Sequence, residues 1–315
     1  MNINIKRISY WLINLIYSTG LLFALLVPVE ASDFNLQEIT DGIYVHYGKQ
    51  VKFDHPDHDD IANIGFIIGD NCVAVIDTGG SIRIAKKLYD HIKEITSKPI
   101  CYVINTHVHF DHVLGNIIFK KPGTKFIGHH NLNAELLNSK SFFLKEYANE
   151  LGGKPDDSSI VMSDISVDNT LEINLGNRQL LLTAYPPAHS HSDITIFDKN
   201  TNTLWLSDLL FIDRIPALDG SLKGWLSVMK SFESMKPAYF VPGHGATNLN
   251  FTDAIQPQKK YLTQLLNETR AMIKKGSFLE EAIEQVESKE KLKWLLYEQH
   301  HKRNVSKAFT ELEWE

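Results

Sequence analysis

Residues 100–112 read ICYVINTHVHFDH, and this stretch decides the fold. Its apolar, β-branched first part predicts a buried strand that ends at Thr106. Three imidazoles and one carboxylate then follow within six residues, at His107, His109, Asp111 and His112. Burying such groups without partners costs several kcal/mol, and neutral imidazole and carboxylate are good zinc ligands. We therefore interpret the cluster as metal-binding rather than as a solvated histidine-rich loop.

The spacing of these residues favours two metal ions. His107 and His109 alternate and can face one ion, whereas Asp111 and His112 come after the turn and can face another. Open α/β arrangements place their ligand sites in the loops beyond the carboxyl ends of strands, which is where this segment lies. Three more candidates stand at the ends of distant strand-like runs: His189, Asp208 and His244. Each is a weak signal alone, but together they complete two sites.

The surrounding sequence predicts two β-rich halves. From residue 34 to about 250, short β-rich runs alternate with helical patterns. Residues 61–70 and 71–79 predict a hairpin, and residues 82–96 carry apolar side chains near helical spacing. A second β-rich half follows, with a helix near residues 222–235. The pattern predicts an α/β fold in which two sheets pack together with helices outside.

The sequence changes character after residue 250. Residues 254–301 hold few β-type runs but much Leu, Glu, Lys and Gln at helical spacing, and Gly276 fits the end of a first helix. We predict a helical extension over residues 253–315. It is expected to pack on the main domain, residues 32–252.

The N-terminal residues 1–31 are interpreted as a signal peptide. Lys6 and Arg7 precede an apolar stretch, and Val29 and Ala31 are small residues at the two positions that a signal peptidase accepts. An uncleaved membrane anchor is the alternative, because the apolar stretch approaches spanning length. We expect cleavage after Ala31, no stable membrane insertion thereafter, and a periplasmic or secreted protein.

Composition and charge narrow the range of partners. The 315 residues carry a formal net charge of −6 and are 43% hydrophobic, which is ordinary for a globular protein. A net negative chain has no general attraction to phosphate backbones, so nucleic acid is not expected as a partner. Export would permit a disulfide between the two cysteines, Cys72 and Cys101. Both lie in apolar strand-like runs, however, and we favour buried free thiols.

The complete motif order, HVHFDH, AHS, SD and PGHG, resembles that of the metallo-β-lactamase superfamily. The resemblance covers roughly residues 34–250 and implies a four-layer α/β/β/α sandwich with a dinuclear metal centre at one edge. Carried over by motif position, it also implies two sets of ligands and a bridging residue. The first metal would be held by His107, His109 and His189, the second by Asp111, His112 and His244, and Asp208 would bridge them.

The wider sequence is similar to the quinoprotein relay system zinc metallohydrolases. The segments IANIGFIIG, AVIDTGGS, IPALDGSLKGWL and FTELEWE carry this likeness over nearly the whole mature chain. These proteins are exported relatives of the sulfur-oxidation thiol hydrolases and are associated with periplasmic quinoprotein dehydrogenases. The resemblance implies two zinc ions, with iron or manganese as alternatives, and a functional link to a quinoprotein dehydrogenase.

We expect a hydrolase of small carbonyl substrates, of the thioester or lactone type. Two zinc ions can share a water and lower its pKa toward neutrality, which provides a hydroxide that attacks the carbonyl. Asp111 would orient the hydroxide and take up its proton. The alternatives are a class B-like β-lactamase, a mononuclear iron oxygenase, and a non-catalytic metal-binding accessory protein of the quinoprotein system.

Residues around the predicted ligands receive weaker interpretations. Asp77 either braces the metal loop, since metal-bound histidines need an orienting partner, or caps a turn. Asp193 is a similar candidate. The basic run 300–303 is interpreted as a solvated helix end, with contact to an anionic substrate as the alternative. Residues 46–60 are interpreted as an exposed loop near the mouth of the site.

Overall fold

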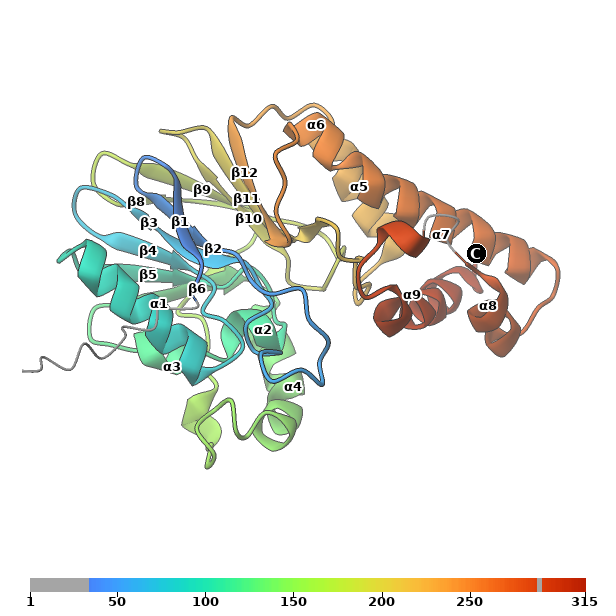
Figure 1. The fold of residues 1–315 in the computed structure, drawn as a ribbon, viewed down its shortest axis with the longest axis horizontal. Coiled ribbons are helices and arrows are strands. Elements are labelled where there is room, and N and C mark those ends of the chain that lie inside the picture. Colours follow the sequence, from blue (N-terminus) through green and yellow to red (C-terminus); the bar gives the residue numbers. More distant parts are fainter. Residues whose placement is uncertain (1–33, 288–290) are drawn as a thin grey trace, which may run out of the picture. The chain divides into compact units, whose positions relative to one another are not determined.

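Two β-sheets lie at the centre of the fold (Figure 1). The computed structural model describes residues 34–287 and 291–315, so the predicted signal peptide lies outside the described residues. In spatial order, the first sheet contains β1 (Leu36–Thr40), β2 (Ile43–His46), β3 (Ile64–Ile68), β4 (Val73–Ile76), β5 (Ile100–Ile104), β6 (Lys125–His129) and β7 (Ile165–Val167). The second contains β12 (Tyr239–His244), β11 (Thr203–Phe211), β10 (Ile194–Asp198), β9 (Gln179–Ala184) and β8 (Thr170–Asn174).

The first sheet joins an antiparallel half to a parallel half. β1 to β4 pair antiparallel, and the predicted hairpin is formed by β3 and β4. β4 to β7 pair parallel. The first parallel crossover is α1 (Ile82–Ile95), which Ser81 caps through the amide of Ile84. Ile84, Leu88 and Ile92 form the buried face of this helix, and their spacing places it against the sheet.

The second sheet is antiparallel except for the pair formed by β11 and β12. β11 and β12 run parallel and are connected through α5 (Leu222–Phe232). Every residue of β11 is buried, as is typical of a strand with both faces covered. Its sequence, TLWLSDLLF, is apolar except at a few positions, and Asp208 is the one charged residue within it. A buried carboxylate in such a strand requires a charged partner.

The two sheets face each other across a shared core. Ile104 of β5, Leu182 of β9 and Trp205 of β11 belong to one buried cluster. Helices cover the outer faces, with α1 and α3 (Asn116–Phe119) on the first sheet and α5 on the second (Figure 1). The predicted four-layer α/β/β/α arrangement is therefore confirmed. Two further helices, α2 (Phe110–Val113) and α4 (Leu132–Glu146), and a 3₁₀ turn (Asp157–Ser159) lie between β5 and β7 in the sequence.

The C-terminal part of the chain is helical and shares the core of the second sheet. Its elements are α6 (Phe251–Ala254), α7 (Gln256–Lys274), α8 (Leu279–Gln285), a 3₁₀ turn (Lys291–Lys293) and α9 (Tyr297–Leu312). Leu262 of α7 and Val305 of α9 pack in the same buried cluster as Leu206 of β11. Gly276 follows α7 in the left-handed conformation, as its position predicts. In the described ranges, no helix has the length and apolar character needed to cross a membrane.

The expectation of free thiols is wrong. Cys72 and Cys101 form a disulfide, and their Cα atoms lie 5.8 Å apart. The register of β4 and β5 explains the pairing, because Val73 lies opposite Ile100 and so brings the two cysteines together at the start of neighbouring strands. The apolar character of both segments, on which the expectation rested, carries no information on this register.

Candidate metal centre

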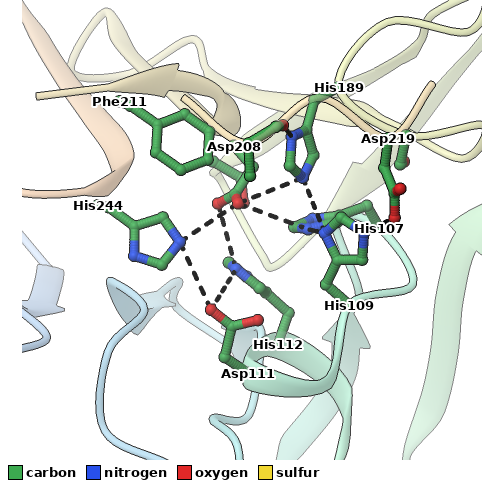
Figure 2. A network of polar contacts seen from close by, with 12 residues as sticks. His107, His109, Asp111, His112, His189, Asp208, Phe211, Asp219 and His244 are labelled. Carbon is green, nitrogen blue, oxygen red and sulfur yellow. Dashed lines mark hydrogen bonds and ion pairs between the residues drawn. The ribbon is translucent and has the colours of Figure 1, made fainter. Parts of the chain in front are cut away.

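The structure brings all seven predicted ligand residues together at one edge of the two sheets (Figure 2). They arrive from the loop after β5, from α2, from the loop after β9, and from β11 and β12. All but His109 are buried. Their ligand atoms form two groups, and within each group these atoms lie within 4.8 Å of one another. The first group is His107, His109, His189 and Asp208, and the second is Asp111, His112 and His244.

Hydrogen bonds fix the tautomers of two imidazoles in the first group. His109 Nε2 lies 3.0 Å from Asp219 Oδ2, and His189 Nδ1 lies 2.7 Å from the carbonyl oxygen of Ala217. Both partners only accept, so these ring nitrogens carry the protons. The other two nitrogens, His109 Nδ1 and His189 Nε2, then carry bare lone pairs only 2.9 Å apart. When both rings are neutral, no proton is left to join them, and a cation between them would satisfy both.

The same argument applies to His107. Thr106 Oγ1 lies 2.7 Å from Asp77 Oδ2 and donates its single proton there. It therefore accepts from His107 Nδ1, which lies 3.0 Å away. His107 Nε2 is left bare and faces His109 Nδ1 at 3.1 Å. Three imidazole lone pairs thus converge on one point.

The second group repeats this pattern. His112 Nδ1 donates to Asp77 Oδ2 at 2.8 Å, and His244 Nδ1 donates to the carbonyl oxygen of Ile61 at 2.7 Å. When both rings are neutral, their Nε2 atoms are therefore bare, and that of His112 has no hydrogen-bond partner among the described residues. Asp111 Oδ2 lies 3.4 Å from His244 Nε2 and 3.7 Å from His112 Nε2.

Asp208 lies between the two groups. Its Oδ1 is 3.1 Å from His112 Nε2, and its Oδ2 is 3.2 Å from His244 Nε2 and 3.3 Å from His189 Nε2. The neighbouring strand leaves room for this carboxylate, because a Cβ atom at Gly243 would collide with it. Five imidazoles and two carboxylates, with lone pairs converging and buried atoms lacking partners, are a donor set that fits zinc.

The electrostatics favour the ligating forms of His107, His189 and Asp208 but not that of His112. Burial lowers the pKa of His189 to about 3, and it holds the pKa of His107 well below the usual range, so both rings are neutral at pH 7. Burial also opposes the charged form of Asp208, but the surrounding imidazoles outweigh it and hold the pKa of this carboxyl well below its usual value. For His112, burial is outweighed by the carboxylates of Asp208, Asp111 and Asp77, so its pKa is well above normal. A bound metal would displace this proton.

Two predicted supporting residues hold the loops that carry the ligands. Asp77 is fully buried and accepts hydrogen bonds from the amide and hydroxyl of Thr106 and from His112. It therefore braces the metal loop instead of merely capping a turn. Asp193 accepts from the amide and hydroxyl of Ser190, next to His189, and burial raises its pKa to about 6.

Sequence reasoning missed Asp219. Its carboxylate accepts from His109 (Figure 2). It also accepts from Arg303 of α9 at 2.6 Å. Asp219 and Arg303 are 84 positions apart. No local pattern links an aspartate before one helix to a histidine and an arginine on two other elements, so only the packing of α9 reveals the contact.

Two weaker interpretations are wrong. The run 300–303 is not a solvated helix end, because His300 and His301 are buried and His301 Nδ1 lies 3.0 Å from the hydroxyl of Tyr261. Residues 46–60 are not all an exposed loop, since His46 is buried on β2 and pairs with Asp60 at 2.6 Å. Tertiary packing covers part of each polar segment, and their sequences do not show this.

A pocket of about 310 Å³ opens onto the ligand groups. Its lining includes His109, Asp111, His189, Asp208 and His244 from the two groups, together with aromatic side chains and with His300 and Arg303 of α9. A cavity of this size suits a small molecule. His129, His130 and His191 do not belong to this lining.

Comparisons with known proteins agree with this geometry. The model of the metallo-beta-lactamase superfamily matches residues 59–244. No curated protein sequence matches the chain significantly. Among solved structures, a metallo-beta-lactamase from Pontibacter korlensis is similar with a TM-score of 0.58 and 15% identity, over 73% of this chain and 99% of that one. The sec-alkylsulfatase Pisa1 from Pseudomonas sp. is similar with a TM-score of 0.66 and 16% identity, over 89% of this chain and 50% of that one. At identities of 15% and 16%, these similarities show that the folds are alike.

Proposed function

The chain belongs to the metallo-beta-lactamase superfamily and is a metal-dependent hydrolase, and from this premise we propose that it uses two zinc ions to cleave a small thioester or lactone. One observation carries the proposal: imidazole nitrogens of two ligand groups converge from both sides on the carboxylate of Asp208. This arrangement favours a pair of cations over a single one.

The ligand residues divide between the two ions. His107, His109 and His189 would hold the first, and the second would be held by Asp111, His112 and His244, with Asp208 shared. A bound pair of divalent ions supplies a hydroxide at neutral pH and a Lewis acid for the carbonyl oxygen. Iron or manganese would suit a similar ligand set, so the identity of the metal is part of the proposal.

Asp111 is the residue of the chain that we propose moves the proton. Its Oδ2 faces His112 and His244, and the residue also lines the pocket. Its Oδ1 can therefore accept the proton of the attacking water and pass it to the leaving group. Cleavage of a thioester or lactone needs no nucleophile besides this hydroxide, and the pocket would position the substrate.

We also propose that the protein works outside the cytoplasm, with a functional link to a quinoprotein dehydrogenase. The basic and apolar pattern of residues 1–31 supports export, and so does the disulfide between Cys72 and Cys101, since such bonds persist in oxidising compartments. The link to a quinoprotein dehydrogenase rests on the sequence likeness described above.

The test uses the mature form, residues 32–315, with the metals that it carries on purification. Metal content is measured by mass spectrometry, and hydrolysis is assayed on panels of thioesters, lactones and β-lactams. We expect two zinc ions and turnover of thioesters or lactones, and a loss of at least about 100-fold in kcat for Asp111→Asn. Asp90→Asn, on the exposed face of α1, is the matched control and should keep full activity.

Other outcomes would change the proposal. Two zinc ions without turnover on any panel would favour a non-catalytic accessory role. Turnover confined to the β-lactams would replace the thioester or lactone proposal with a β-lactamase. A single bound iron with oxygen consumption would favour a mononuclear oxygenase.

A further inference from the structure

Strand β11 departs from regular pairing in its second half. Ser207 lies opposite Pro242 of β12, and the next aligned pair is Phe211 with His244. Three residues of β11 therefore stand against a single residue of β12, which makes a β-bulge. On its other side, β11 pairs with β10 only through its first three residues. Strand pairing is thus interrupted in the segment that carries Asp208.

The backbone is also strained next to Asp208. Ser207 has a φ of 48°, in the left-handed region that residues other than glycine rarely adopt. The backbone of β12 lies so close that a Cβ atom at Gly243 would stand 2.6 Å from the amide nitrogen of Asp208. Such a conformation persists only where its surroundings hold it. Here it directs the Asp208 carboxylate between the two ligand groups.

A buried glutamine takes the place of the missing strand partner. Gln258 lies in the first turn of α7 and is fully buried. Its Oε1 accepts the amide of Phe211 at 2.8 Å, and its Nε2 donates to the carbonyl oxygen of Leu209 at 2.8 Å. The indole Nε1 of Trp225 donates to the same carbonyl at 3.1 Å. A backbone amide only donates and a backbone carbonyl only accepts, so both ends of the glutamine side chain are assigned.

The groups that Gln258 holds are directly connected to ligand residues. Leu209 follows Asp208 in the chain, and the ring of Phe211 stacks on that of His244 with centroids 4.9 Å apart (Figure 2). Without the glutamine amide, the buried N–H group of Phe211 would lose its acceptor and the carbonyl of Leu209 one of its two donors. The bulge would then relax toward regular pairing. Because side chains alternate along a strand, a shift by one residue would turn the Asp208 carboxylate away from the ligand groups.

We propose that Gln258 is a positioning residue for the metal centre: its amide holds the bulge of β11, and the bulge holds the Asp208 carboxylate between two metal ions. The inference rests on the proposed function, because it needs ions for Asp208 to bridge. It gives α7 a role in metal binding besides its packing against the second sheet. Asp208 faces both ligand groups, so loss of the amide should weaken the binding of both ions.

The test follows metal binding and local backbone protection in the mature protein. Cobalt(II) is titrated into the metal-free protein, and its visible absorption reports the geometry of its ligands. Hydrogen exchange of residues 205–212 is measured by mass spectrometry. Gln258→Met keeps the volume of the side chain but not its amide. In this variant we expect both cobalt ions to bind about tenfold more weakly, with an altered spectrum, and residues 205–212 to exchange about tenfold faster.

Two control variants separate this role from a general loss of stability. Thr269→Val removes a buried hydroxyl from the same helix and should leave the affinities, the spectrum and the exchange unchanged. Asp198→Asn weakens a buried ion pair with Arg178, outside the ligand groups. It should lower the temperature of thermal unfolding without changing the cobalt spectrum. If Gln258→Met does not fold, Gln258→Asn, whose shorter side chain cannot reach both backbone groups, should give the same changes to a smaller extent.

A folded Gln258→Met protein with the cobalt affinities and spectrum of the wild type would overturn the inference. Changes of the same size in Asp198→Asn would overturn it as well, because they would reflect stability alone. If the wild type binds a single cobalt ion and Gln258→Met weakens its binding, the positioning role stands and the proposed pair of ions fails. A wild type that binds no cobalt would refute both.

Discussion

At the scale of single residues, the hydrogen bonds of the imidazoles determine which ring nitrogen of each histidine faces the candidate metal centre. Each ligating imidazole has its second nitrogen engaged by an acceptor, either a carboxylate such as Asp219 or Asp77 or a carbonyl such as that of Ile61, or by the hydroxyl of Thr106. These contacts decide which nitrogen is bare, and they hold the rings in place. Placing five imidazoles close together lowers the stability of the folded protein, and metal binding would restore it.

Asp219 allows the orienting contacts to be tested. Removing its carboxylate in Asp219→Ala releases Nε2 of His109, so we expect zinc affinity to fall about 10- to 100-fold. Arg303→Gln leaves the carboxylate in place and removes only its ion pair, so its effect should be smaller. Competition titrations with a chromophoric chelator measure both affinities. Equal affinities of wild type and Asp219→Ala would contradict the role given to Asp219.

A second prediction concerns His129, which lies away from the ligand groups. Its Nδ1 accepts the amide of Asn131, and burial beside His130 lowers its pKa to about 4. The usual pKa in an unfolded chain is about 6.5, so between these values the unfolded state binds more protons and stability falls as the pH falls.

We therefore expect the free energy of unfolding to decrease less between pH 7 and pH 5 in His129→Gln than in the wild type. Urea unfolding of the metal-free proteins at both pH values measures this difference. His55→Gln, an exposed histidine, is the control and should behave like the wild type. Parallel pH dependences in all three proteins would show that His129 is not the titrating group.

At the scale of elements, the strands and the ligand motifs can be predicted from the sequence. The residues that support the ligands through hydrogen bonds cannot. The segment 100–112 predicts both a strand and its metal loop, because apolar periodicity and a dense set of imidazoles are local signals. Asp208 and His244 could be found because each ends or interrupts an apolar run. Asp219 carries no such signal, since its importance comes from elements that meet only in the folded chain.

The disulfide also depends on contacts that the sequence does not show, and its contribution to stability can be tested. It connects β4 to β5 and closes a loop with a sequence separation of 29 residues. The double substitution Cys72→Ala, Cys101→Ala should lower the free energy of unfolding by about 3 kcal/mol, because the unfolded chain regains the freedom of this loop.

Zinc content should stay the same in that double variant, because the cysteines do not belong to either ligand group. Urea unfolding with and without dithiothreitol provides the measurement. The reductant should destabilise only the wild type. Equal sensitivity of both proteins to dithiothreitol would contradict the assignment.

At the scale of the whole described chain, the C-terminal helices complete the site as well as the core. α9 packs beside the second sheet through residues such as Val305, and the same helix supplies His300 to the pocket and Arg303 to Asp219. The sequence predicted helices that pack on the main domain, but helical spacing alone does not show which polar side chains turn inward. The pocket is thus a joint product of the sheet edges and this extension.

The central claim is that seven side chains from both sheets hold a pair of metal ions. Anomalous diffraction at the zinc absorption edge, from crystals of the zinc-loaded mature protein, tests it most directly. We predict two peaks on either side of the Asp208 carboxylate, one against His107, His109 and His189 and the other against Asp111, His112 and His244. A single peak, or peaks at other residues, would contradict the account.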